Sequence, residues 1–466
     1  MNDRVNELES ELQAERMDQQ DCDHNGPFSH RQRRHAAMQS ASLARGNSRL
    51  HTAAATCPSI ALRPGNLSEF RQQWRNGGPA CVLGVGTANP GNCIQQDDYT
   101  DWYFRITKSD HLTHTKAIMK KMCEKMKVKK RYLQVNEELF HEHPEFLDPA
   151  APTLPGKLAV VANVMPGLVA AAAEKAIAEW GRPAGDITHL VFATSTSAQL
   201  PHIDLRIASL LGLSATVQRT AICFHGCSGS SAGLRIAKDI AENNRGARVL
   251  VACADMWSVM DGYAAVPDAA QERYGIIGRA LFGDGAGAVV VGADPRAGVE
   301  RPIFEMVSAS QATLPGTDRA LAAELTKDGM EYRLEFGELA AQVGGNIERC
   351  LVDAVSPPLG IGGVGWNWNG LFWVVHPGGP AIMDSFTEAL GLEPAKLAAS
   401  RRVLSEYGNM TGPTTIFVLD EVIRRGQRNH EEGSCEWGLM VGFGPGFTIE
   451  VMALHACNGE SVRHQD

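Results

Sequence analysis

Residues 221–244, AICFHGCSGSSAGLRIAKDIAENN, hold the feature around which the chain is organised. An apolar run leads into a corner of small residues at Gly226–Gly229, and apolar residues at helical spacing follow. Cys227 is thus expected where a strand turns into the N-terminus of a helix. The backbone N–H groups and dipole of a helix N-terminus lower a thiol pKa, which predicts a nucleophilic cysteine. The alternative is a small buried hydrophobic residue, as most free cysteines are.

Composition restricts the class of protein. The chain has 466 residues, 44% of them hydrophobic and 21% charged, which is enough for two large domains or one duplicated fold. A formal net charge of −9 argues against a nucleic-acid binder. The apolar runs near 158–173 and 249–254 are shorter than a membrane span. Eleven scattered cysteines without repeated Cys-x-x-Cys spacing favour reduced thiols in a cytoplasmic protein over disulfides or a zinc site.

The first 67 residues are expected to be a disordered N-terminal extension, followed by a half from 68 to 300, a second half from 301 to 458 and a short tail from 459 to 466. The stretch 28–63 has the composition of a transit peptide, but the acidic start of the chain argues against one.

Strands and helices alternate along the folded part. Apolar strands are predicted at 79–87, 187–194 and 248–254, and helices at 99–126, 203–211 and 158–180, the last kinked or interrupted at Pro166. Strands that are apolar on both faces indicate an α/β sheet covered on both sides.

Two segments have the same plan, which predicts an internal duplication. Residues 282–292 and 442–452 each combine a glycine-rich entry with a β-branched strand, and each closes one half of the chain. The apolar strand 371–376 likewise ends in a reactive residue, as the strand before Cys227 does. The halves are expected to meet near residue 300.

A cysteine nucleophile needs partners that manage charge on the attacked carbonyl. His376 ends a predicted strand and Asn409 follows a glycine. An imidazole and an amide can donate hydrogen bonds to an oxyanion. Each residue alone is weak evidence, because a lone histidine is usually structural and Asn-Gly neighbours usually form turns.

From about Ser68 to Ala456 the chain resembles the plant type III polyketide synthases, the chalcone synthase family. The matching stretches are 84–90 (GVGTANP), 129–132 (KKRY), 226–227 (GC), 237–250 (AKDIAENNRGARVL), 280–285 (ALFGDG), 376–381 (HPGGPA), 407–410 (YGNM) and 442–446 (GFGPG). The resemblance implies a thiolase-like fold of two duplicated halves in layered αβαβα arrangement, and a homodimer.

The resemblance also implies the chemistry. Cys227, His376 and Asn409 match the catalytic set of the family. Cys227 would take an acyl group from a CoA thioester, and His376 and Asn409 would hold malonyl-CoA while it loses CO₂ and attacks the acyl group. No metal or other cofactor is implied, only CoA thioesters as substrates. Phe282 matches a gatekeeper phenylalanine, although ordinary core packing would also place an apolar residue there.

Lys121 and Lys125 match family positions that contact CoA phosphates, whereas a third such lysine is Ile118 here. They lie in a basic cluster, 120–131, which is unusual in an acidic protein. The alternative is a solvated helix face.

The expected pocket departs from chalcone synthases. Two threonines align with Trp257 and Met260, a second gatekeeper phenylalanine with Tyr332, and a cavity glycine with Ala323. Beside Cys227, glutamine and an aromatic residue are replaced by His225 and Ser228, and His225 either alters local charge or bonds to the backbone. The other pocket residues implied by the alignment are Ser195, Thr196, Leu200 and Thr411.

A more crowded pocket cannot hold the same tetraketide without rearrangement, so the usual chalcone is not expected as the main product. Short pyrones, alkylresorcinols and curcuminoid-like products are the open alternatives. Two other functions are also open: a non-catalytic homologue that binds CoA esters or acts as a scaffold, and a ketoacyl synthase of fatty acid metabolism.

Overall fold

A nine-stranded mixed sheet forms the core, with strand order β11-β12-β13-β8-β1-β7-β6-β4-β5. The computed structural model describes residues 78–148, 150–263, 273–359, 366–428 and 435–457. The expected extension 1–67 and tail 459–466 lie outside them. The strands of this sheet are β1 (Ala80–Ala88), β4 (His189–Thr194), β5 (Gln218–Cys223), β6 (Arg248–Asp255), β7 (Gly285–Ala293), β8 (Phe304–Thr313), β11 (Phe372–Val375), β12 (Trp437–Gly444) and β13 (Thr448–Ala456).

Twelve α-helices and two small sheets complete the described part of the chain. The helices are α4 (Gln96–Ile106), α5 (Thr113–Lys125), α6 (Glu137–Glu142), α7 (Leu154–Trp180), α8 (Asp204–Leu210), α9 (Gly229–Asn243), α10 (Trp257–Met260), α11 (Arg273–Leu281), α12 (Phe336–Leu359), α13 (Pro380–Ala389), α14 (Ala398–Tyr407) and α15 (Thr414–Arg428). The small sheets pair β2 (Asn92–Gln95) with β3 (Lys130–Leu133) and β9 (Leu321–Thr326) with β10 (Gly329–Leu334).

The strand order confirms the duplication. β1 and β8, the first strands of the two halves, lie side by side at the centre of the sheet. From them the order runs β1-β7-β6-β4 in the first half and β8-β13-β12-β11 in the second. In both halves the first strand is followed by the last strand, then by the next-to-last strand, and then by an earlier one. The strands β7 and β13, which close the two halves, occupy equivalent places. The segment 442–452 spans a turn, however, because β12 ends at Gly444 and β13 begins at Thr448.

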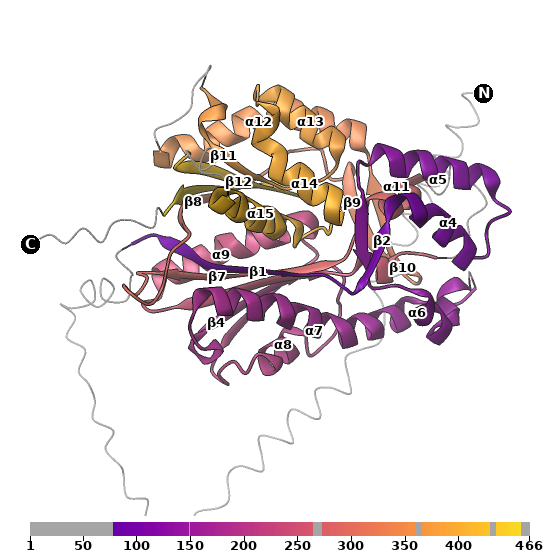
Figure 1. The fold of residues 1–466 in the computed structure, drawn as a ribbon, viewed down its shortest axis with the longest axis horizontal. Helices are drawn as coiled ribbons and strands as arrows, with labels where there is room; N and C mark the ends of the chain where they lie inside the picture. The colour runs from indigo at the N-terminus through magenta and orange to yellow at the C-terminus, as the bar shows by residue number, and fades with distance from the viewer. Residues whose placement is uncertain (1–77, 149, 264–272, 360–365, 429–434, 458–466) are drawn as a thin grey trace, which may run out of the picture. The chain divides into compact units, whose positions relative to one another are not determined.

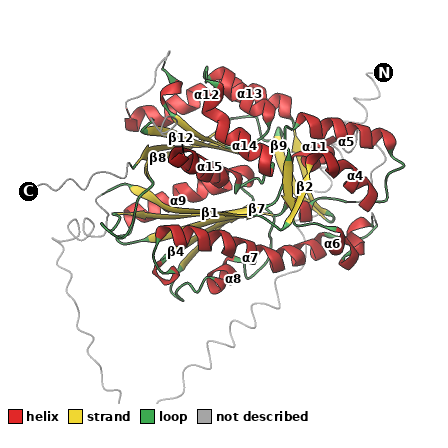
Figure 2. Cartoon of the chain, in the orientation of Figure 1, coloured by secondary structure: helices red, strands yellow, loops and turns green. Residues whose placement is uncertain are grey.

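The elements stack in five layers, αβαβα (Figure 1). α7 packs on β1, β7 and β6 from one side, and α12 packs on β8 and β13 from the other. Between the two sheet halves lie α9, which contacts β6 as well as β12, and α15, which contacts β1 as well as β11. Figure 2 shows the same alternation of helices and strands. The thiolase-like arrangement is therefore confirmed.

Helix α7 lies unusually close to β1. A Cβ atom added at Gly84 or Gly86 would come within 2.3 and 2.1 Å of the carbonyl oxygens of Ala176 and Ala172. Glycine on the strand and alanine on the helix let the two backbones approach, which explains the GVG sequence of the strand.

Two predictions about the helices were wrong. The helix expected at 99–126 is two helices, α4 and α5, because Lys108 has a left-handed φ of 53° and Thr107 turns its hydroxyl back to the carbonyl of Tyr103. Of the kink or interruption expected at Pro166, the interruption does not occur, because α7 is continuous there. At 27 residues α7 is also long and apolar enough to span a membrane, contrary to the estimate from sequence, but it packs on the central sheet as a core helix.

Candidate active site

The Cys227 corner forms as predicted. β5 ends at Cys223, a single 3-10 turn covers Gly226–Ser228, and α9 begins at Gly229. Gly226 has φ +53°, and a Cβ atom there would lie 2.8 Å from the ring of Pro445. Its backbone N–H donates to Oγ of Ser195 at 2.8 Å. The corner is thus anchored to the loop that follows β4.

The residues that flank Cys227 bond to the backbone. The His225 ring lies 3.2 Å from the carbonyl of Cys223, and the Ser228 hydroxyl donates to the carbonyl of His225 at 2.9 Å. Of the two alternatives for His225, the structure favours the structural one.

His376 and Asn409 reach the same place from the second half of the chain. His376 follows β11, and its backbone N–H donates to the carbonyl of Val441. The Asn409 side-chain oxygen accepts from Thr411 N at 2.8 Å and from Thr414 Oγ1 at 3.3 Å. These donors direct the amide nitrogen Nδ2 towards Cys227, whose Sγ is 3.9 Å away.

Cys227, His376, Asn409 and Phe282 line one cavity, so the structure brings the three predicted catalytic residues together. The remaining wall is almost entirely apolar and is formed by Leu281, Leu321, Leu334, Phe336, Leu339, Gly378, Ile382, Phe443 and Phe447. The cavity has a volume of about 30 Å³. That volume holds only a few water molecules.

The sequence predicted a lowered pKa for the Cys227 thiol, but in the structure this pKa is raised. Burial raises the pKa of the Cys227 thiol from 9.0 to about 12, although Asn409 lowers it through a hydrogen bond. Burial also lowers the pKa of His376 to about 3. A helix N-terminus contributes only about 0.3–1 kcal/mol, whereas each pKa unit corresponds to about 1.4 kcal/mol. Desolvation therefore outweighs the helix dipole, and both groups rest neutral.

Asp255 is a site residue that the sequence reasoning missed. It is 1% exposed and ends β6. Its carboxylate accepts hydrogen bonds from Ser195 N, Thr194 Oγ1, Thr411 Oγ1 and Gly412 N. Since Ser195 anchors the Cys227 corner and Thr411 anchors Asn409, one carboxylate connects both. The available signal was an acid at the end of an otherwise apolar strand.

Thr411 carries local strain at this junction. Its φ is +60°, a conformation that β-branched residues rarely adopt. Hydrogen bonds hold it there: its N–H donates to Asn409, its hydroxyl donates to Asp255, and its oxygen accepts from Trp257 Nε1 at 2.8 Å. Such strain is typical of functional sites.

Phe282 packs against two other aromatic rings, those of Trp257 and Tyr332. Trp257 stacks on Phe282 with ring centroids 5.2 Å apart, and Tyr332 packs edge-on against both rings. These three residues line a second, smaller hollow together with Tyr99, Arg131, Leu133, Ser258, Asp261, Tyr263, Gly278 and Arg279. Phe282 belongs to both walls and thus lies between the two spaces.

The other predicted pocket residues lie elsewhere. Ser195, Thr196, Met260 and Thr411 are buried behind the cavity and are not part of its wall. In this single chain Leu200 is 95% exposed after β4 and Ala323 lies on the exposed part of β9, so their place beside a pocket stays a prediction. A sequence alignment gives the position along the chain but not the direction of the side chain.

Lys121 and Lys125 are exposed on α5, one helical turn apart, and Ile118 is half-buried one turn earlier. Neither lysine forms an ion pair within the described part of the chain. Their cationic face is thus available to an anionic ligand.

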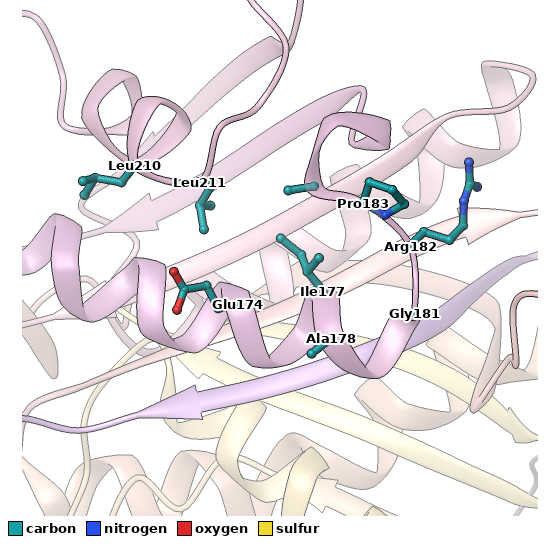
Figure 3. A pocket seen from close by; sticks show the side chains of 9 residues that line it. Glu174, Ile177, Ala178, Gly181, Arg182, Pro183, Leu210 and Leu211 are labelled. Atoms are coloured by element: carbon teal, nitrogen blue, oxygen red, sulfur yellow. The ribbon is translucent and has the colours of Figure 1, made fainter.

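A larger hollow is separate from this site. An open groove of about 470 Å³ lies between the end of α7 and the end of α8. Figure 3 shows Glu174, Ile177 and Arg182 on one side and Leu210 and Leu211 on the other. It shares no lining residue with the Cys227 cavity.

No cluster of three or more metal-ligating side chains occurs among the residues that the structure describes. Residues 67–295 match the family model described as chalcone and stilbene synthases, N-terminal domain. Residues 305–458 match the corresponding C-terminal domain. The chain is also 51% identical over 408 residues to a bisdemethoxycurcumin synthase of Oryza sativa subsp. japonica, covering 86% of this chain and 98% of that relative. The chain therefore belongs to the chalcone and stilbene synthase family of plant type III polyketide synthases and is an acyltransferase that uses an acyl-CoA starter and malonyl-CoA.

Proposed function

We propose that Cys227 carries the growing acyl chain, that His376 and Asn409 activate malonyl-CoA, and that the product is a curcuminoid or another compound made with fewer malonyl extensions than a cyclised tetraketide. The observation that supports this most directly is the convergence of the three side chains in one narrow apolar cavity. The name of the rice relative points in the same direction.

In the loading step, Sγ of Cys227 attacks the thioester carbon of the starter, and the C–S bond to CoA breaks. The thiol proton passes to Nε2 of His376, which has no partner in the described structure, and then to the departing CoA sulfur. The Thr415 hydroxyl lies 3.5 Å from Nδ1 and can either accept from it or donate to it. His376 can therefore take up a proton in this step and donate a hydrogen bond in the next.

In the extension step, Nε2–H of His376 and Nδ2–H of Asn409 donate to the thioester oxygen of malonyl-CoA. The bond to the carboxylate breaks, CO₂ leaves, and the negative charge collects on that oxygen. The enolate carbon then attacks the acyl group on Cys227 and releases the thiolate. Fixed donors in a dry cavity are each worth about 3–4 kcal/mol to such a step. The mechanism calls on no metal or other cofactor.

The number of extensions in the product is inferred from the volume of the cavity beside Cys227. Trp257 fills the position of a smaller family residue, and the indole is fixed by Thr411. A cavity of about 30 Å³ has to expand for any acyl chain, and each added two-carbon unit needs more room. Early release after few extensions is the expected consequence.

The test is incubation of the purified chain with malonyl-CoA and a panel of aromatic and fatty acyl-CoA starters, with products identified by mass spectrometry. Cys227→Ala is expected to abolish condensation while malonyl-CoA decarboxylation continues. If the chain releases no CO₂ and forms no product with any starter, the result would favour a non-catalytic CoA-ester-binding homologue. Activity only with a carrier-protein-bound substrate would favour a ketoacyl synthase.

We further propose a cytoplasmic homodimer that pairs through β5. This edge strand has only β4 as a neighbour and is mostly exposed, so its outer backbone groups are open to pairing with a second strand. Exposed Leu200 and Phe224 flank it. Leu200→Asp is expected to shift the mass measured by light scattering from two chains towards one, and an unchanged dimer would rule out this face.

A further inference from the structure

Arg131, on β3, is a buried cation that the chemistry above leaves without a role. The residue is 1% exposed, its Nη2 has no hydrogen-bond partner, and no described carboxylate forms an ion pair with it. Asp284, whose pKa the charge of Arg131 lowers, interacts with it without forming a direct ion pair. Burying a charge that has no direct ion-pair partner is costly, so the contacts of Arg131 should reveal what it is kept for.

The hydrogen bonds of Arg131 and of its neighbour Gln96 hold residues 280–282, the segment that contains Phe282. Nη1 donates to the carbonyl of Phe282 at 2.7 Å, and Nε donates to Oε1 of Gln96 at 3.0 Å. Gln96 in turn donates through Nε2 to the carbonyl of Ala280 at 2.7 Å. The guanidinium lies 4.1 Å above the ring of Tyr99, which fixes its plane. Two side chains thus hold carbonyls on either side of Leu281.

The same segment is bonded to Asn409. Phe282 and Asn409 form an isolated parallel bridge. Asn409 N donates to the carbonyl of Leu281 at 3.0 Å, and Gly283 N donates to the carbonyl of Asn409 at 3.1 Å. Whatever fixes the Phe282 backbone therefore also fixes the backbone of Asn409.

Glycines on both strands of the bridge allow close packing here. Gly408 precedes Asn409 with φ +70°, and a Cβ atom there would lie 2.7 Å from the carbonyl oxygen of Leu281 and 3.0 Å from Cγ and Cδ of Arg131. Gly283 follows Phe282, and a Cβ atom there would lie 2.5 Å from the carbonyl oxygen of Tyr407, whereas Cβ of Arg131 is at an ordinary contact distance of 3.7 Å. Gly408 thus leaves room for the Arg131 stem, and Gly283 lets the two backbones of the bridge approach.

We propose that Arg131 is a positioning residue that sets the Asn409 amide and the Phe282 ring in one register, so that malonyl-CoA is held correctly for decarboxylation. This inference rests on the proposed function. Cys227 is not expected to respond, because the hydrogen bonds that hold its corner run through Ser195 and Asp255 and not through Arg131.

The test compares Arg131→Lys with the wild-type chain. Lysine can still reach the Phe282 carbonyl but cannot bond Gln96 or stack as a plane on Tyr99. Release of labelled CO₂ from malonyl-CoA is measured per active site, with the sites counted by iodoacetamide labelling of Cys227. The expected result is a fall in kcat of about 10- to 100-fold with KM changed less than about threefold. The rate of Cys227 labelling should not change.

Arg248→Lys is the matched control, because Arg248 is equally buried but bonds Glu300 at the far end of β6. It is expected to lower stability and leave kcat per site intact. If Arg131→Lys does not fold, Gln96→Leu gives the answer, since it should lower kcat in the same direction by less. An unchanged kcat per site in a folded Arg131→Lys or Gln96→Leu chain would overturn the proposal. A wild-type chain that releases no CO₂ would overturn the proposed function itself.

Discussion

Replacing Asp255 with asparagine tests how the site is held together. Burial raises the pKa of Asp255 from 3.8 to about 6 in spite of its four hydrogen bonds. At about 1.4 kcal/mol for each pKa unit, the ionised carboxylate costs the folded state about 3 kcal/mol. Because the folded-state pKa is raised, this group's contribution to stability is complete below pH 3.8 and is lost as pH rises through about 6.

Asp255→Asn removes this pH dependence and also removes acceptors. The amide oxygen can accept from two of the four donors, and its NH₂ group faces the others. Each unsatisfied buried donor costs about 1–3 kcal/mol. Near pH 7 the cost of the unsatisfied donors offsets the free energy gained by removing the buried negative charge. The variant should therefore have nearly wild-type to moderately lower stability at that pH. Near pH 4 the deficit relative to wild type should be larger by about 3 kcal/mol.

The assays are urea unfolding at both pH values and the pH profile of Cys227 alkylation. The negative charge of Asp255 contributes to the raised pKa of Cys227, so Asp255→Asn should lower that pKa and speed alkylation at a given pH. Turnover should nevertheless fall by about 10- to 100-fold, because the Cys227 corner and Asn409 lose their common anchor. Slower alkylation, or a stability difference that does not grow between pH 7 and pH 4, would refute the reasoning. Full turnover in the variant would show that the anchor is unnecessary.

Three further predictions follow from other parts of the structure. Trp257→Thr should lower the free energy of unfolding by about 3–5 kcal/mol and give products with more extensions, whereas an unchanged product spectrum would mean that Trp257 does not limit chain length. Lys121→Ala with Lys125→Ala should raise KM for CoA esters about tenfold, with little change in kcat and a weaker dependence on salt; equal KM values would exclude a CoA-binding role. Burial opposes ionisation of Glu300, yet hydrogen bonds from buried Arg248, from the backbone of Arg296 and from half-buried Arg182 hold its pKa well below the ordinary value. Its stabilisation is therefore present at neutral pH and lost on acidification, and Glu300→Gln should cost about 3–5 kcal/mol in urea unfolding at pH 7.

The sequence predicted well wherever a local pattern was enough. The corner at Cys227 depends on the spacing of small and apolar residues, and it forms where expected. The strands that close each half are similarly visible from their glycine and β-branched residues. The break between α4 and α5 was missed because it depends on Lys108 adopting a left-handed φ, which no periodicity reveals.

Side-chain surroundings were predicted less well. Leu200 and Ala323 align with pocket positions but are exposed in the chain described here, and Met260 is buried behind the wall. Asp255 received no weight, because an acid at a strand end is ordinary until its four donors, from two distant segments of the chain, are seen together.

By itself, the sequence determined the family and the duplicated layered fold and singled out Cys227, His376 and Asn409 as candidate catalytic residues, since motifs and periodicities are properties of the linear chain. Only the tertiary structure decided the protonation and the room at that site. Desolvation by residues distant in sequence raises the pKa of Cys227 to about 12, and the stacked rings of Trp257, Phe282 and Tyr332 limit the space beside it. Both effects depend on how completely surrounding atoms exclude water, which a sequence does not specify position by position.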